Sequence, residues 1–88
     1  MKPLNYAILK YFTKVEEASP LDVFEAIKGE YGTFKMCTVP KIDEAIQTAE
    51  KNGLLVESRY ELDANGELVQ YYKAEGEGLD AINSFIKD

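Results

Sequence analysis

The stretch LLVESRYELDANGELVQYYKAEGEG, residues 54–78, contains two runs in which apolar and polar residues alternate, with a turn sequence between them. A period of two residues is that of a β-strand, because successive side chains of a strand point to opposite faces. Asn65-Gly66 is a strong signal for a two-residue hairpin turn. The stretch therefore predicts a β-hairpin.

The hairpin turn sets which residues pair across the two strands. A two-residue turn places Leu62 opposite Val69 and Tyr60 opposite Tyr71, whereas a four-residue loop over 63–66 would slip the register while keeping the same residues on the same faces. In the first strand one face holds Leu54, Val56, Ser58, Tyr60 and Leu62, and the other holds Leu55, Glu57, Arg59 and Glu61. We expect the first of these faces to be the apolar one.

Four segments around the hairpin have the period of an α-helix. Residues 3–15 form the first. The second has Ser19 as its N-cap and Pro20 at its first position, and Gly29 and Gly32 weaken or end it. The third has Thr38 or Val39 as cap and ends at Gly53. The last covers residues 76–87. Their inward stripes are Leu4, Ile8, Tyr11, Phe12 and Val15; Leu21, Phe24, Ile27 and Tyr31; Val39, Ile42, Ile46 and Ala49; and Leu79, Ile82, Phe85 and Ile86.

Length and composition predict one globular unit over residues 1–88, and the predicted helices and hairpin make its class α+β. The chain has a single cysteine, Cys37, and no histidine, which removes the common zinc spacings and the histidine-dependent catalytic triads. We expect no catalytic residue, metal or cofactor. The sequence has no signal-like segment and no long apolar span, so we expect a soluble, cytoplasmic protein without membrane contact.

Charge is distributed unevenly along the chain, whose net charge is -6. Residues 57–88 hold eight acidic residues and three basic ones, a local balance of -5. Affinity for nucleic acid rests on cations that displace condensed counterions. The acidic C-terminal third therefore disfavours nonspecific attraction to DNA, and only a local basic face would permit it.

The order helix, helix, helix, hairpin, helix resembles the winged helix-turn-helix superfamily over nearly the whole chain. The most specific pieces are YAILKYF in the first helix, AEKNGLLV where the third helix enters the hairpin, and YYKAEGEGLDAI at the end. The last is similar to the ending of small prokaryotic regulators of the PadR-like and MarR-like groups, although Ala74 and Glu75 stand where those proteins have an apolar residue and a capping threonine. The resemblance implies a DNA-binding protein that regulates transcription, with the third helix in the major groove and the hairpin as a wing.

The resemblance implies that the exposed face of the third helix contacts DNA. Lys41 and Lys51 would bind phosphates, Gln47 would read an adenine edge, and Glu44 would accept from cytosine or repel phosphates. The predicted set comprises Lys35, Thr38, Lys41, Glu44, Gln47, Thr48, Lys51 and Arg59. The alternative is a solvated surface of mixed charge.

The wing has an unusual charge for a DNA-binding hairpin. Glu61, Asp63 and Glu67 surround its tip, whereas a wing that grips the minor groove normally carries arginine or lysine. The competing hypothesis is a protein-protein interaction module that meets a basic partner through the acidic wing and the last helix. We also expect a homodimer through the first and last helices, since two-fold symmetry would pair the reading helices on half-sites.

Cys37 has two interpretations. As a residue just before the third helix it would be a redox-sensitive thiol with a pKa lowered by the helix N-terminus. As a small apolar residue it would be buried in the core.

Overall fold

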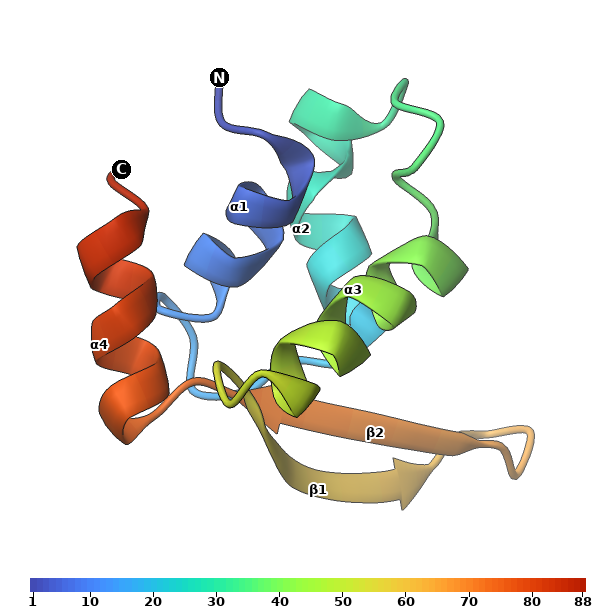
Figure 1. The fold of residues 1–88 in the computed structure, drawn as a ribbon. Helices are drawn as coiled ribbons and strands as arrows, with labels where there is room; N and C mark the ends of the chain where they lie inside the picture. Colours follow the sequence, from blue (N-terminus) through green and yellow to red (C-terminus); the bar gives the residue numbers. More distant parts are fainter.

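The computed structural model describes residues 1–88, and its elements follow the predicted order (Figure 1). The helices are α1, Leu4–Tyr11; α2, Pro20–Tyr31; α3, Val39–Lys51; and α4, Gly76–Phe85. The strands are β1, Val56–Leu62, and β2, Leu68–Lys73, which pair antiparallel. Helices α1 to α3 pack together, α4 lies beside α1, and the hairpin extends away from the helices (Figure 1). The α+β class is as the pattern predicts.

The predicted helix caps at α2 and α3 are present. The Ser19 hydroxyl accepts a hydrogen bond from the Asp22 N–H, and the Asp22 carboxylate accepts one from the Ser19 N–H, which completes a capping box. Thr38 caps α3 by accepting from the Lys41 N–H, and Gly53 takes φ +79 just beyond the helix. Local chemistry therefore fixes where these two helices begin.

Helix α1 is shorter than the predicted range of 3–15. It ends at Tyr11, and the N–H groups of Phe12, Thr13 and Lys14 bond to carbonyls three residues back. The Thr13 hydroxyl also donates to the Lys10 carbonyl, at 2.7 Å. These tight bonds close the last turn early, and the chain leaves to form an extended segment at Ala18.

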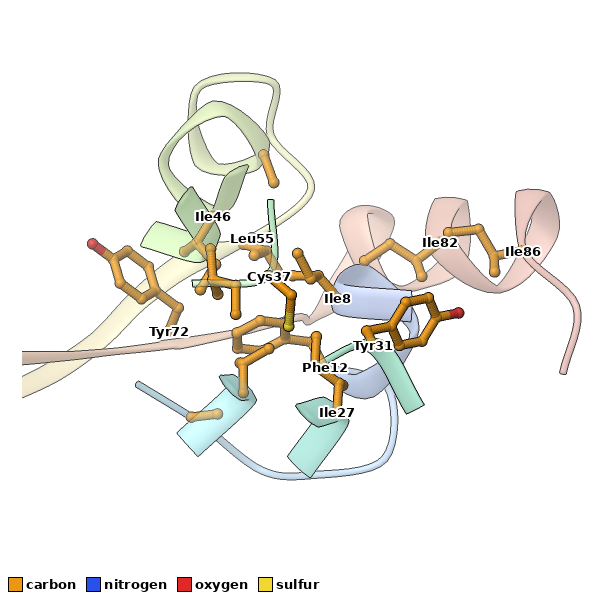
Figure 2. Close-up of a cluster of buried hydrophobic side chains, with 14 residues drawn as sticks. Ile8, Phe12, Ile27, Tyr31, Cys37, Ile46, Leu55, Tyr72, Ile82 and Ile86 are labelled. Atoms are coloured by element: carbon orange, nitrogen blue, oxygen red, sulfur yellow. The ribbon is translucent and has the colours of Figure 1, made fainter. Parts of the chain in front are cut away.

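The core lies between the helices and the base of the hairpin (Figure 2). Fourteen buried residues form it: Ile8, Phe12, Ala18, Val23, Ile27, Tyr31, Cys37, Ile42, Ile46, Ala49, Leu55, Tyr72, Ile82 and Ile86. The predicted inward side of α2 needs one correction, because Leu21 is exposed and Val23 is fully buried instead. Val23, Ile27 and Tyr31 follow one another at intervals of four residues, which keeps them on one helical face. The predicted inward residues of α3 are confirmed, with Val39 partly buried at the start.

The predicted register of the hairpin is wrong by one residue. Leu62 pairs with Leu68 and Tyr60 with Gln70, and the loop holds five residues, 63–67. The Asp63 carboxylate accepts hydrogen bonds from the N–H groups of Asn65 and Glu67, at 2.8 and 2.9 Å. A side chain that caps its own turn in this way replaces the two-residue turn that Asn65-Gly66 suggested.

The predicted apolar face of β1 is also largely uncovered. Leu55 is buried at 1% exposure, whereas Tyr60 and Leu62 are 68% and 67% exposed. The hairpin extends beyond the helices, so only its base meets the core (Figure 1). An irregularity between Glu57 and Arg59 further breaks the simple alternation of faces.

One pairing was not predicted. Ala18, in the link between α1 and α2, exchanges two backbone hydrogen bonds of 2.9 Å with Tyr72 of β2. Ala18 thereby continues the sheet at the base of β2, on the edge away from β1.

Helix α4 ends at Phe85, two residues before the predicted limit. It packs on α1 through Ile82 and Ile86, and the Lys10 ammonium donates to the Asn83 side chain and to the Ile86 carbonyl, both at 2.9 Å. Phe85, which was expected inside, is 82% exposed. Position 85 turns outward because Ile82 and Ile86, four residues apart, already define the inward face.

Candidate nucleic-acid interface

The outer face of α3 carries five of the predicted residues together. Lys41, Glu44, Gln47, Thr48 and Lys51 are all exposed, opposite the buried stripe of the same helix. Thr38 lies at the N-terminus of this helix, and Lys35 is exposed in the loop that leads into it. The helical wheel thus located a continuous polar surface.

Side chains on this face already have partners. The Lys41 ammonium lies 3.4 Å from the Glu44 carboxylate, and the Gln47 amide donates to Asp43 at 3.1 Å. The Thr48 hydroxyl donates to the Glu44 carbonyl at 3.0 Å. Gln47 would therefore have to release Asp43 before its amide could contact a base edge with both of its polar atoms.

Lys35 and Lys51 form no ion pair with any acidic residue of the chain. An unpaired ammonium contacts a phosphate without first losing a carboxylate partner. These two lysines are therefore the cations of the predicted set that are most available to a polyanion.

Arg59 lies apart from the α3 face, at the base of the wing. Its guanidinium donates to Glu17 at 2.7 Å and to Glu61 at 2.8 Å, and it stacks over the Tyr71 ring at 4.1 Å. The two carboxylates raise the pKa of Arg59 further, so its charge is permanent but fully neutralised. Arg59 fastens the wing to the link before α2 and is a poor phosphate ligand in this arrangement.

The carboxylates around Arg59 are stabilised in their charged form. The pKa of Glu17 is lowered by a 2.6 Å hydrogen bond from the Ser58 hydroxyl and by Arg59. The pKa of Glu61 is lowered by hydrogen bonds from Arg59 and Tyr71. Glu17 lies 41 and 42 residues before its partners. No sequence pattern signals a pairing over that distance, so sequence reasoning missed Glu17.

A groove of about 630 Å³ separates α3 from the wing. Ser19, Pro20, Leu21, Asp22, Val39, Pro40, Asp43, Gln47, Glu61, Asp63, Leu68, Val69, Gln70, Tyr71 and Tyr72 line it. Four of these residues are acidic and none is lysine or arginine. The groove therefore repels phosphates, and it confines any DNA contact to the outer face of α3 and the loop before it.

Cys37 is buried at the start of α3, and burial raises the pKa of its thiol. Of the two interpretations, burial with a raised pKa supports the core residue and contradicts a thiol whose pKa is lowered by the helix N-terminus. Cys37 is a small core residue, packed among the apolar side chains (Figure 2).

No helix of the chain has the length and hydrophobicity needed to cross a bilayer.

The backbone is similar to that of PadR from Bacillus subtilis, whose crystal structure was determined in complex with operator DNA. The TM-score is 0.74 at 22% sequence identity, and the matched region covers 93% of this chain and 45% of that PadR chain. The chain thus spans just under half the length of the protein it resembles. No protein-family model and no curated protein matches the sequence. The likeness establishes a winged helix-turn-helix fold, with α3 as the third helix and β1–β2 as the wing.

Proposed function

We propose that this protein binds duplex DNA and regulates transcription, and that α3 is its reading helix. The observation that carries the proposal is the combination of the winged helix-turn-helix backbone with a solvent-exposed polar face on α3. The similar PadR structure contains operator DNA. Because a shared fold does not by itself imply a shared function, the proposal depends on the residues of this face.

The α3 face offers two kinds of contact. Lys51 and Lys35 are exposed and unpaired, and Lys41 joins them once a phosphate displaces Glu44. These lysines would position the duplex, whereas Gln47 would supply sequence discrimination. Glu44 and Thr48 lie between them on the same face and would meet base edges, while Thr38 holds the first turn of the helix in place.

Arg59 takes no part in the proposed contact in its present arrangement. Because the groove holds four acidic residues and the guanidinium is neutralised, the wing would not attract phosphates. The affinity for DNA would come from α3. This division differs from a wing that inserts cations into the minor groove. The small number of available lysines predicts weak binding with a shallow salt dependence, a slope of only about 2–3.

Fluorescence anisotropy with labelled random duplex DNA, at low and then physiological salt, tests the proposal. Lys51→Ala should weaken binding uniformly across sequences and reduce the salt slope by about 1. Lys87→Ala is the matched control, because Lys87, like Lys51, is exposed and forms no ion pair, but follows α4 away from the α3 face. If the native protein does not bind DNA at low salt, or if both variants lose the same affinity, α3 is rejected as the DNA-contacting surface.

Sequence reading is tested separately, on a site selected from random DNA. Gln47→Ala should relax the preference at one base pair, by about 1–3 kcal/mol of discrimination. An unchanged preference would assign sequence discrimination to other residues.

We also propose a homodimer through α1 and α4. Phe85 is the most exposed large apolar side chain of the chain and lies on α4. Sedimentation of the native protein and of Phe85→Ser at micromolar concentration tests this: a native mass near twice 9.9 kDa that halves in the variant is the expected result. A native monomer would remove the proposal.

The interaction-module hypothesis stays a prediction. Charge reversal at Glu61 and Glu67 should abolish binding of a basic protein partner to the wing, and unchanged binding would count against it.

A further inference from the structure

Strand β2 has an open edge beyond its pairing with Ala18. The N–H and C=O of Tyr72 bond to Ala18 on the edge away from β1. At the other end, the Glu67 carbonyl accepts from the Asp63 N–H, on the edge toward β1. Hydrogen-bonding groups of successive residues in a strand alternate between its two edges. The backbone groups of Leu68 and Gln70 therefore point to the same edge as those of Tyr72, where no strand pairs with them.

This open edge lies along the groove between α3 and the wing. Leu68 and Gln70 both line the groove, and Leu21 of α2 and Pro40 of α3 are among the apolar residues across from them. Its volume of about 630 Å³ falls in the range of about 300–1,000 Å³ typical of ligand sites. Leu21 and Leu68 are more than half exposed, so the groove has uncovered apolar surface beside unpaired backbone groups.

The charge of the groove specifies the chemistry of its occupant. Asp22, Asp43, Glu61 and Asp63 line it without any basic residue. Glu61 forms an ion pair with Arg59, so the uncompensated negative charge of the groove lies on the three aspartates. These aspartates are held in place by the hydrogen bonds that they accept: Asp22 from the Ser19 N–H, Asp43 from the Gln47 amide, and Asp63 from the backbone of the turn.

We infer that this groove binds an extended, basic segment of a protein partner, which adds to β2 as a third full strand. The strand would continue from the short pairing at Ala18, and its backbone would bond to Leu68 and Gln70. Main-chain hydrogen bonds supply affinity in strand addition, and side-chain pockets supply specificity. Alternate lysine or arginine side chains of the segment would meet the aspartates, and the intervening apolar side chains would cover Leu21 and Leu68.

This site adjoins the proposed DNA-binding face of α3 and shares Gln47 with it, but the two proposals rest on different observations and neither depends on the other. Duplex DNA does not fit the groove, because its phosphates would approach three uncompensated aspartates. An acidic segment is excluded for the same reason. A neutral strand would gain the backbone bonds without the electrostatic attraction.

The test uses a fluorescein-labelled peptide of eight residues in which lysine alternates with valine, titrated by anisotropy against the native protein. Gln70→Pro removes the N–H that points to the open edge while leaving the β1–β2 ladder intact, since proline is tolerated on an edge strand. We expect at least about a 5-fold loss of affinity in this variant, from one net hydrogen bond. Gln70→Ala keeps the N–H and should bind as the native protein does.

A second pair of variants tests the charge. Asp43→Asn keeps an acceptor for Gln47 and should weaken peptide binding about 2- to 5-fold, as expected for one solvent-accessible ion pair. Glu57→Gln makes the same change of charge on β1, outside the groove, and should leave binding unchanged. Hydrogen exchange provides a third readout: the amide of Gln70 should become protected when the peptide binds.

Three results would overturn the inference. These are no binding of the basic peptide by the native protein, equal affinity of Gln70→Pro and Gln70→Ala in folded protein, or equal losses in Asp43→Asn and Glu57→Gln. Should Gln70→Pro fail to fold, the protection of the Gln70 amide in the native protein decides the matter. Binding of random duplex DNA that is lost in Gln70→Pro but kept in Gln70→Ala would assign the groove to nucleic acid instead.

Discussion

The substitution Gly78→Ala tests how α4 is seated on the rest of the fold. Gly78 is buried in the first turns of α4, against the turn that joins α3 to the wing. An added Cβ would lie 2.6 Å from the Leu54 carbonyl oxygen and 2.8 Å from the Gly53 carbonyl oxygen. Ordinary carbon–oxygen contacts lie at about 3.3–3.6 Å. Backbone would have to move by most of an ångström to accept a single methyl group.

The magnitude follows from two opposing contributions. Overpacking of a dense site costs up to about 3 kcal/mol. Replacing glycine by alanine within a helix stabilises it by about 1 kcal/mol. Because both neighbours at position 78 are backbone atoms that cannot rotate away, we expect a net destabilisation of about 2 kcal/mol. For a domain of this size that lowers Tm by roughly 8–16 °C.

Gly29→Ala is the matched control. Gly29 lies in α2, and nothing stands within 4 Å of the place that a Cβ would occupy. The same substitution should there stabilise the protein by up to about 1 kcal/mol, since only the helix contribution remains. Urea denaturation followed by circular dichroism measures both variants. A Gly78→Ala protein as stable as Gly29→Ala would refute the close seating of α4 on the α3–wing turn.

Three further predictions concern charge and reactivity. Glu44→Gln should strengthen binding to random duplex DNA and steepen its salt dependence by about 1, because it frees Lys41 from its ion pair, and weaker binding in the salt titration would contradict this. The pKa values of Glu17 and Glu61 are lowered from 4.5, so their stabilising contribution is present above pH 4.5 and is lost as pH falls below it. Glu17→Gln should therefore flatten the acid decline of the unfolding free energy below pH 4.5, and an unchanged acid profile by urea titration would oppose it. Cys37 in the native protein should resist iodoacetamide at neutral pH and react fully in urea, as read by mass spectrometry, because its thiol is buried with a raised pKa.

The sequence predicted what local chemistry controls. Ser19-Pro20 and Thr38-Pro40 mark the starts of α2 and α3, and the spacing of Ile42 and Ile46 defines which side of α3 is exposed. Caps and helical periods act within a few residues, so a single segment contains all the information that they need. The α+β class and the polar face proposed to contact DNA followed from these signals.

Tertiary structure decided the rest, because the deciding contacts join distant segments. The pairing of Ala18 with Tyr72 covers one end of the outer edge of β2 and leaves the rest open, and the bond from Arg59 to Glu17 pairs the wing's one arginine with a carboxylate from the link before α2. The alternation of β1 shows only that two faces exist. Which face the core covers depends on how far the hairpin extends past the helices, and this leaves Tyr60 in solvent and Leu55 buried. A periodic pattern reports orientation along one element, whereas burial and ion pairing depend on what the fold places beside it.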